Sequence, residues 1–147
     1  MNTSISVLLE QKGGAVRSVP TTVTVLEAVH EMNRHKIGSV LVMNGHRLAG
    51  IFTERDVLLR VVGEEVDPMT TPITQVMSAE VLTITPETTV QEVMDLFADR
   101  RCRHLPVMKD EQVVGLISIG DVSRFVAGVH RAEAESLRQY IAGGLST

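Results

Sequence analysis

The chain contains the same sequence pattern twice. Residues 16–63 reappear at 81–128, displaced by 65 positions without a gap. A repeat of this length is one supersecondary unit copied, and neighbouring units of this kind bury their apolar faces against each other. The repeat therefore predicts one pseudo-symmetric domain with two related clefts. Identical residues in the first copy include Thr24, Val25, Glu27, Val42, Met43, Gly50, Asp56, Val57, Val61 and Gly63.

Composition limits the class of protein. A chain of 147 residues with 44% hydrophobic residues is long enough for one sizeable core. A formal net charge of -4 argues against nucleic acid or an anionic membrane as the main partner. A single cysteine, Cys102, excludes an intramolecular disulfide and a cysteine-rich zinc site. With no signal-peptide pattern and no apolar run of membrane-spanning length, the sequence predicts a cytoplasmic protein.

Each copy has the same order of predicted elements. Capping boxes at residues 24–27 and 89–92 precede apolar residues at helical spacing. Strands are expected at 39–43, 48–52, 105–108 and 113–117, with turns at Asn44-Gly45 and Lys109-Asp110. Short leading strands are expected before Pro20 and Pro86, and second helices begin at Thr53 and Ser118. Two β-α-β-β-α copies predict a mixed α/β (α+β) fold packed as one module.

Three segments complete the predicted organisation. Residues 5–11 form a short lead-in helix that ends at Gly13-Gly14, and residues 64–72 form a polar linker. The repeats then span 8–63 and 73–128. Residues 129–147 form a helical tail, whose apolar residues could dock on the domain or on a second subunit: Val129, Leu137, Tyr140 and Ile141.

The candidate functional residues are polar side chains shared by both copies. Thr53 and Asp56 match Ser118 and Asp121, in the form hydroxyl, two residues, aspartate. One interpretation is a second pair of capping boxes, although the first-helix boxes use the longer glutamate. The other is a ligand site, because a carboxylate on the first helical turn accepts hydrogen bonds from a diol and free N–H groups there attract phosphate. A ribose phosphate satisfies both.

The chain resembles a tandem pair of cystathionine-β-synthase (CBS) domains, also called a Bateman module. The resemblance covers residues 8–128 and rests on the repeated element order, the Thr-Ile-Thr-Pro86 entry, the Arg103-His-Leu-Pro-Val107 segment and the doubled Gly-h-h-Ser/Thr-x-x-Asp ending. It implies a non-catalytic sensor that binds an adenine nucleotide in clefts between the repeats, and a homodimer. AMP, ADP, ATP, NAD and adenosyl-methionine-like ligands share adenosine, so the ligand stays open.

The resemblance also implies site residues. The aspartate of one repeat takes the ribose hydroxyls, while the adenine lies against strands of the other repeat. A ligand held by Thr53 and Asp56 would have its adenine near Met77, Val81, Leu82, Cys102, Arg103 and Pro106. A ligand held by Ser118 and Asp121 would have its adenine near Lys12, Val16, Arg17, Ile37 and Gly38. Ordinary core packing is an equally good interpretation of each of these adenine-slot residues taken singly.

The two copies differ where a phosphate would bind. Arg103 and His104 replace Gly38 and Ser39, and Arg55 matches Gly120. A guanidinium before a strand suits phosphate coordination, so we expect two unequal sites, with Arg55, Arg103 and His104 serving the more charged ligand. Arg100 and Arg101 match His35 and Lys36, and are expected to complement helix C-termini.

The sequence also bears on two other classes of function. An enzyme is disfavoured because the five histidines show no metal-ligand spacing and Cys102 has no recognisable base. No Gly-rich phosphate loop is present in the sequence either. A dimerisation or docking module that has lost its ligand and regulates a partner protein is the alternative to the nucleotide sensor.

Overall fold

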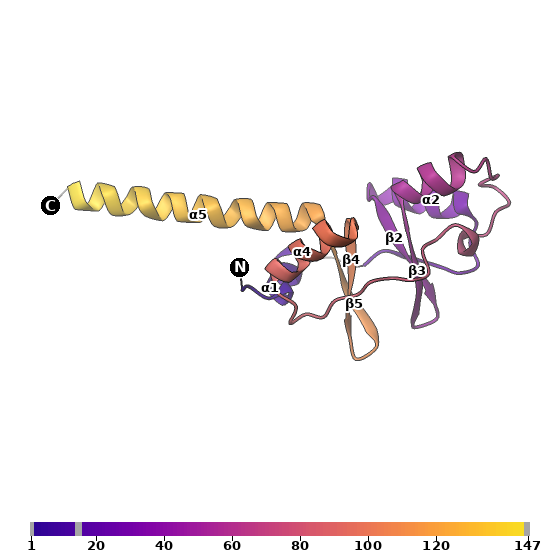
Figure 1. Cartoon of the computed structure of the whole chain (residues 1–147), viewed down its shortest axis with the longest axis horizontal. Coiled ribbons are helices and arrows are strands. Elements are labelled where there is room, and N and C mark those ends of the chain that lie inside the picture. The colour runs from indigo at the N-terminus through magenta and orange to yellow at the C-terminus, as the bar shows by residue number, and fades with distance from the viewer. Residues whose placement is uncertain (1, 14–15, 146–147) are drawn as a thin grey trace. The chain divides into compact units, whose positions relative to one another are not determined.

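The repeated pattern folds into helices and two small sheets, as the α+β prediction requires (Figure 1). The computed structural model describes residues 2–13 and 16–145, with side chains described up to residue 142. The chain forms two compact units that each draw on both repeats. The first combines 1–13, 87–103 and 117–147, and the second combines 14–86 and 104–116. Gly14, expected to help end the lead-in helix, lies outside the described residues.

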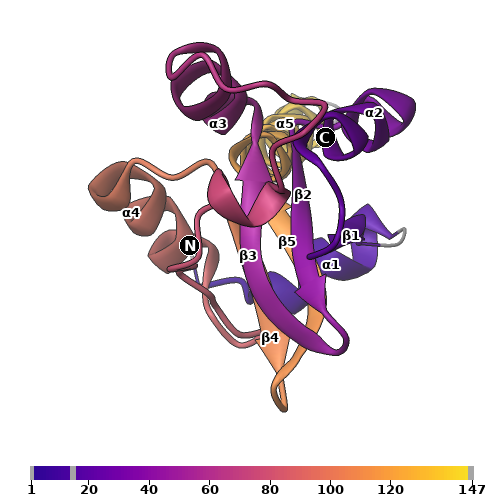
Figure 2. The same cartoon turned by 90° about the vertical axis from the view of Figure 1, so that its right-hand side faces the viewer.

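A three-stranded sheet forms the centre of the second unit. Its order is β1 (Ser18–Pro20), β2 (Ser39–Asn44) and β3 (Arg47–Thr53). β1 pairs in parallel with β2, and β2 pairs in antiparallel with β3, as Figure 2 shows. Helix α2 (Val25–His35) contributes its apolar stripe to the same buried core, which also contains Val40, Val42, Phe52, Val61, Ile73 and Val76.

Local signals fix both ends of the first helix in each copy. Thr24 accepts the N–H of Glu27, and the Glu27 side chain accepts the N–H of Thr24, which completes the predicted capping box of α2. In α4 (Val90–Arg100), Thr89 accepts the N–H of Glu92. Each helix ends in a left-handed residue, Lys36 at φ 53° and Arg101 at φ 53°. Basic residues therefore do lie at both helix C-termini, as expected.

The two hairpin turns lie one residue later than predicted. β2 extends to Asn44 and pairs it with Arg47, so the two-residue turn is Gly45-His46, with Gly45 at φ 62°. Between β4 (His104–Lys109) and β5 (Gln112–Ser118) the turn is Asp110-Glu111, at φ 51° and 65°. Asp110-Glu111 has positive φ at both turn residues and Gly45-His46 at the first, and both patterns are hairpin turns whose twist matches that of the strands.

The second repeat lacks its predicted leading strand. In the first copy the N–H of Leu41 donates to the carbonyl of Arg17 beside β1. The residue matching Leu41 is Pro106, which has no N–H, so the carbonyl of Leu82 cannot accept the equivalent bond. The pairing shrinks to one parallel bridge between Ile84 and Val107. The second sheet therefore has only β4 and β5 as named strands.

The segment after β3 is helical in two steps. α3 (Glu54–Asp56) leads into a π-helical stretch, η1 (Val57–Val62), in which the N–H of Gly63 donates to the carbonyl of Leu58 at 2.9 Å. The predicted linker 64–72 is held to α2, because Leu26 donates to the Pro68 carbonyl and Val25 to the Thr71 carbonyl, both at 2.9 Å. A short 3-10 turn, η2 (Ile73–Gln75), follows.

Three helices build the first unit. α1 (Ile5–Lys12) agrees with the predicted lead-in helix, and its Ile5 and Leu8 are buried. Its N-terminal end is joined to the start of α4 by the bonds from Ile5 N–H to the Thr88 carbonyl and from Val90 N–H to the Thr3 carbonyl, both 2.8 Å. Figure 1 shows α1 and α4 beside the first turns of α5 (Ile119–Leu145).

The predicted tail is not a separate element. α5 runs from Ile119 to Leu145 through Gly128, so the second helix of the second repeat and the tail form one continuous helix. A glycine inside a helix weakens it without ending it, since a helix stop also needs a left-handed residue or a proline. Residues 130–142 are all exposed, including Leu137, Tyr140 and Ile141.

Candidate functional site

Both repeated aspartates lie where a strand passes into a helix. Thr53 ends β3 and Ser118 ends β5, and the aspartate follows three residues later on the first helical turn. One backbone bond recurs at this junction: Glu54 N–H donates to the Gly38 carbonyl at 3.0 Å, and Ile119 N–H to the Arg103 carbonyl at 2.9 Å. The two copies thus present a carboxylate at the same point of the same supersecondary unit.

Asp56 is buried, with 7% of its surface exposed. Its Oδ2 accepts the N–H of Thr53 at 2.9 Å, and its own N–H donates to Thr53 Oγ1 at 3.2 Å. Its Oδ1 lies 3.7 Å from Nε of Arg60, whose Nη1 donates to the carbonyls of Val76 and Met77 at 3.3 and 3.0 Å. Arg60 therefore connects the carboxylate to the chain that follows the linker.

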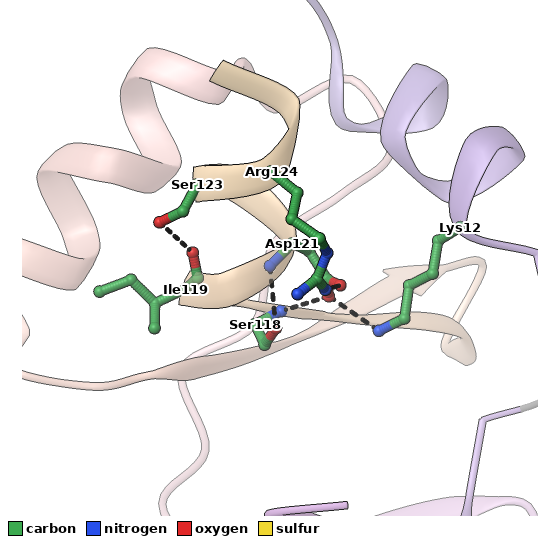
Figure 3. A network of polar contacts seen from close by, with 6 residues as sticks. All are labelled: Lys12, Ser118, Ile119, Asp121, Ser123 and Arg124. Carbon is green, nitrogen blue, oxygen red and sulfur yellow. Dashed lines mark hydrogen bonds and ion pairs between the residues drawn. The ribbon is translucent and has the colours of Figure 1, made fainter. Parts of the chain in front are cut away.

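Asp121 lies close to two cations, Lys12 and Arg124 (Figure 3). Its Oδ2 accepts the backbone N–H of Ser118 at 2.8 Å and the Lys12 ammonium at 2.8 Å. Its Oδ1 pairs with Nη2 of Arg124, one turn along α5, and its N–H donates to Ser118 Oγ at 3.1 Å. Lys12 comes from the end of α1, 109 residues away in the sequence. The site therefore places two cations on one carboxylate.

These contacts change the acidity of Asp121. Burial alone would raise its pKa, but the hydrogen bond from Lys12, the N–H of Ser118 and the Lys12 charge together outweigh burial. The pKa of the Asp121 carboxyl is therefore below its ordinary value. A lowered pKa means that the ionised carboxylate stabilises the folded state above the unfolded-state pKa, and that this contribution is lost as the pH falls through the folded-state pKa.

We expect Asp121→Asn to show this linkage. The difference in unfolding free energy from wild type should be constant near neutral pH and should shrink below about pH 4, where the unfolded carboxylate protonates. Urea denaturation at a series of pH values measures it. Lys12→Met, which removes the main cation, should show a similar pH-dependent difference. A difference for Asp121→Asn that stays constant down to acid pH would contradict this reading.

The capping interpretation of the two motifs is confirmed as geometry. Thr53 and Asp56 form a complete capping box, and Ser118 and Asp121 exchange the same pair of bonds. The shorter aspartate does reach the cap, since Oδ2 of Asp56 accepts the N–H of Thr53 at 2.9 Å. The ligand interpretation is compatible with this geometry and stays a prediction, since a carboxylate has about four acceptor positions and the cap uses one.

The predicted adenine-slot residues are distributed over both units. In the second unit Met77 packs on the core and gives its carbonyl to Arg60, Val81 is half-buried, Leu82 is exposed and Pro106 is buried. Cys102 and Arg103 belong to the first unit. Burial raises the pKa of the half-buried Cys102 thiol above its ordinary value, although its own backbone and Arg100 act in the other direction.

Of the slot predicted for the Asp121 ligand, Lys12 is in direct contact with the aspartate. The remaining members belong to the second unit, and their grouping into one slot stays a prediction. There Val16 is half-buried before β1 and Ile37 packs on the core. The backbone carbonyl of Arg17 accepts the N–H of Leu41, and that of Gly38 accepts the N–H of Glu54.

Two of the three residues predicted to bind phosphate are more exposed than the two aspartates. Arg55 and Arg103 are exposed, and His104 is the half-buried first residue of β4. Sequence reasoning missed Arg60 and Arg124, which pair with the two aspartates. Their spacing of four and three residues from Asp56 and Asp121 is the helical spacing of ion pairs and carries this signal.

Two further properties concern the described part of the chain. Within residues 2–13 and 16–145, no three side chains of the metal-ligating types gather closely enough to hold an ion. Among the helices described there, none combines the length and apolar character needed to cross a bilayer.

Comparison with known proteins identifies the family. The model of the CBS domain matches residues 15–63 and 73–128, which are the two copies of the repeat. The chain therefore belongs to the CBS-domain family, as the sequence resemblance predicted. Proteins of this family are generally regulatory or signal-transduction modules, and those built of CBS domains alone are generally non-catalytic.

Three similar proteins illustrate the family. The mitochondrial CBS domain-containing protein CBSX3 of Arabidopsis thaliana is 39% identical, over 97% of this chain and 74% of its own length. The CBS-domain containing protein ATU1752 from Agrobacterium tumefaciens has a TM-score of 0.79 at 33% identity, covering 83% of this chain and 98% of that one. A hexameric CBS-CP12 protein from bloom-forming cyanobacteria has a TM-score of 0.73 at 27% identity, covering 83% and 67%.

Proposed function

We propose that this chain is a sensor that binds adenine nucleotides, such as AMP, ATP or NAD, at two sites marked by Asp56 and Asp121, and that it performs no chemistry on them. The observation that carries the proposal is the environment of Asp121. A capping box needs one carboxylate oxygen and one hydroxyl, yet this carboxylate also gathers Lys12 and Arg124. A hydrogen-bond acceptor for ribose beside two cations suits a ribose phosphate.

The backbone of the second repeat offers a hydrogen-bond acceptor for the adenine of the ligand at Asp56. In the first repeat the Arg17 carbonyl accepts the N–H of Leu41. In the second repeat Pro106 replaces Leu41 and has no N–H, so the Leu82 carbonyl cannot accept the matching bond. A carbonyl in this position is a suitable acceptor for the exocyclic amino group of adenine. We include Arg55, Arg103 and His104 in the proposal as phosphate ligands, and with them the slot residues named from the sequence.

A thermal-shift panel on the full chain tests the proposal. Adenosine, AMP, ADP, ATP, NAD and S-adenosylmethionine are each added at a range of concentrations, with GMP and CMP as controls for base recognition. A ligand at 100 times its dissociation constant should stabilise the fold by about 2.7 kcal/mol. A protein that no adenine compound stabilises, or that GMP and CMP stabilise equally, would contradict the proposal.

A docking module without a ligand is the second candidate, and it has its own support. Large apolar side chains are exposed on η1 and beyond it, at Leu58, Leu59, Val62 and Met69, and on α5 at Leu137, Tyr140 and Ile141. Exposed apolar clusters of this kind mark protein interfaces. We propose that the chain forms a homodimer in either case and acts on a protein partner. Its cytoplasmic location also stays a proposal, and the plant relative is named as mitochondrial.

A further inference from the structure

At Asp121 a ligand diol competes with a hydrogen-bonded ammonium, whereas the cation beside Asp56, Arg60, lies 3.7 Å from the carboxylate. Oδ2 of Asp121 is shared by the Ser118 N–H and the Lys12 ammonium, each at 2.8 Å. Oδ1 pairs with Arg124. A ribose diol that binds both oxygens must therefore take the place of a cation. The position that matches Lys12 in the second repeat is Met77, so this cation belongs to the Asp121 site alone.

Lys12 is the partner best able to leave Oδ2. The Ser118 N–H is fixed because it is part of the backbone at the start of α5. The Lys12 side chain is 40% exposed and carries its ammonium on a flexible four-carbon chain. Its helix is held at the opposite end, where Ile5 and Leu8 are buried and Ile5 bonds to Thr88. The ammonium can therefore move without α1 leaving the first unit.

What Lys12 meets after moving depends on the ligand. A neutral nucleoside takes the carboxylate and offers no negative charge in exchange, so a charge-assisted hydrogen bond is lost. A nucleotide offers its phosphate to the displaced ammonium and restores such a bond. The carboxylate with Lys12 and Arg124 carries one more positive than negative charge, which favours an anionic ligand further.

We propose that Lys12 is the specificity-determining residue of the Asp121 site: its ammonium pairs with the carboxylate until a nucleotide binds, and then pairs with the phosphate of the bound nucleotide. The site thereby selects anionic adenine nucleotides over adenosine. This inference rests on the proposed function, because it assumes that an adenosine ligand binds at Asp121.

Calorimetric titration of adenosine and AMP tests it, in an Asp56→Ala background that removes the other carboxylate. In Lys12→Met, AMP should bind about tenfold more weakly, while adenosine should bind as tightly as before or more tightly. Lys12→Arg should keep the preference for AMP. Lys109→Met, which removes an exposed lysine at the end of β4, should leave both affinities unchanged.

The outcomes separate this inference from the proposed function. Equal weakening of adenosine and AMP in Lys12→Met would assign Lys12 a structural role and overturn the inference while nucleotide sensing stands. Unchanged affinities for both ligands would overturn it as well. Should the unmodified chain bind none of the adenine compounds in the thermal-shift panel, the proposed function would fail and the inference with it. NMR titration of the Asp121 carboxyl adds a direct check on its pKa. If the pKa is the same in Lys12→Met as in wild type, the ion pair does not form in solution and the inference is overturned.

Discussion

Alanine at Asp56 or Asp121 should weaken adenine-nucleotide binding about ten- to hundredfold at the altered repeat. The expected size follows from the loss of charge-assisted hydrogen bonds to ribose, each of which contributes about 1.5 to 3 kcal/mol. The fold should survive, because each carboxylate caps one helical turn and a lost cap costs about 1 kcal/mol. Calorimetric titration of AMP into the two single variants and the double variant measures the effect.

The first-helix capping box supplies a matched control. Glu27 holds the N–H of Thr24 as Asp56 holds the N–H of Thr53, at the same position relative to its helix. Glu27→Ala should therefore lower the unfolding free energy by a similar amount and leave nucleotide affinity unchanged. If both aspartate variants instead bind like wild type and only melt earlier, the two motifs are caps without a ligand role.

The predictability of the helix starts shows how far local signals reach. Thr24 and Thr53 were expected at helix N-termini because each hydroxyl is followed three residues later by a carboxylate. Together these two groups accept hydrogen bonds from backbone N–H groups that have no acceptor within the helix. That chemistry is contained within four residues, so the sequence carries it completely. The strands β2 to β5 were likewise foreseen, because their apolar runs lie between strong turn residues.

The differences arise where one residue acts on a distant partner. Pro106 prevents the second leading strand, because its missing N–H acts on a segment more than twenty residues earlier in the chain. The turn at Gly45-His46 is set by the pairing of Asn44 with Arg47, which a dipeptide preference alone does not determine. The second repeat was expected to end at Gly128 with a helical tail after it, and α5 runs through Gly128 without a break.

The same distinction between local signals and distant contacts applies to the candidate site. Asp56 and Asp121 were found because the repeat shows them twice, and Arg60 and Arg124 could have been found from their helical spacing. The contact between Lys12 and Asp121 joins residues 109 positions apart, and no local pattern contains it. Only the family resemblance placed these two residues in one site, and it assigned Lys12 to the adenine rather than to the carboxylate.

Removal of the C-terminal half of α5 should convert a homodimer into a monomer. From residue 130 to 142 this helix is exposed on every side, and its apolar side chains are 59% (Leu137), 80% (Tyr140) and 51% (Ile141) exposed. A helical segment of this length without tertiary contacts is marginal in water, so a partner helix would stabilise it. Twofold pairing with the same helix of a second copy buries the same apolar face on both subunits.

Light scattering at micromolar concentration, on the full chain and on a version ending at Gly128, measures the change. Charge placed on the apolar face, in Leu137→Glu or Ile141→Glu, should dissociate the dimer as truncation does. Gln139→Glu is the matched control, because at 100° per residue Gln139 lies on the opposite side of the helix. A monomeric full chain would contradict the dimer. A dimer that persists after truncation would instead move the interface to the second exposed cluster, on and beyond η1, where Leu58 and Val62 are each 64% exposed.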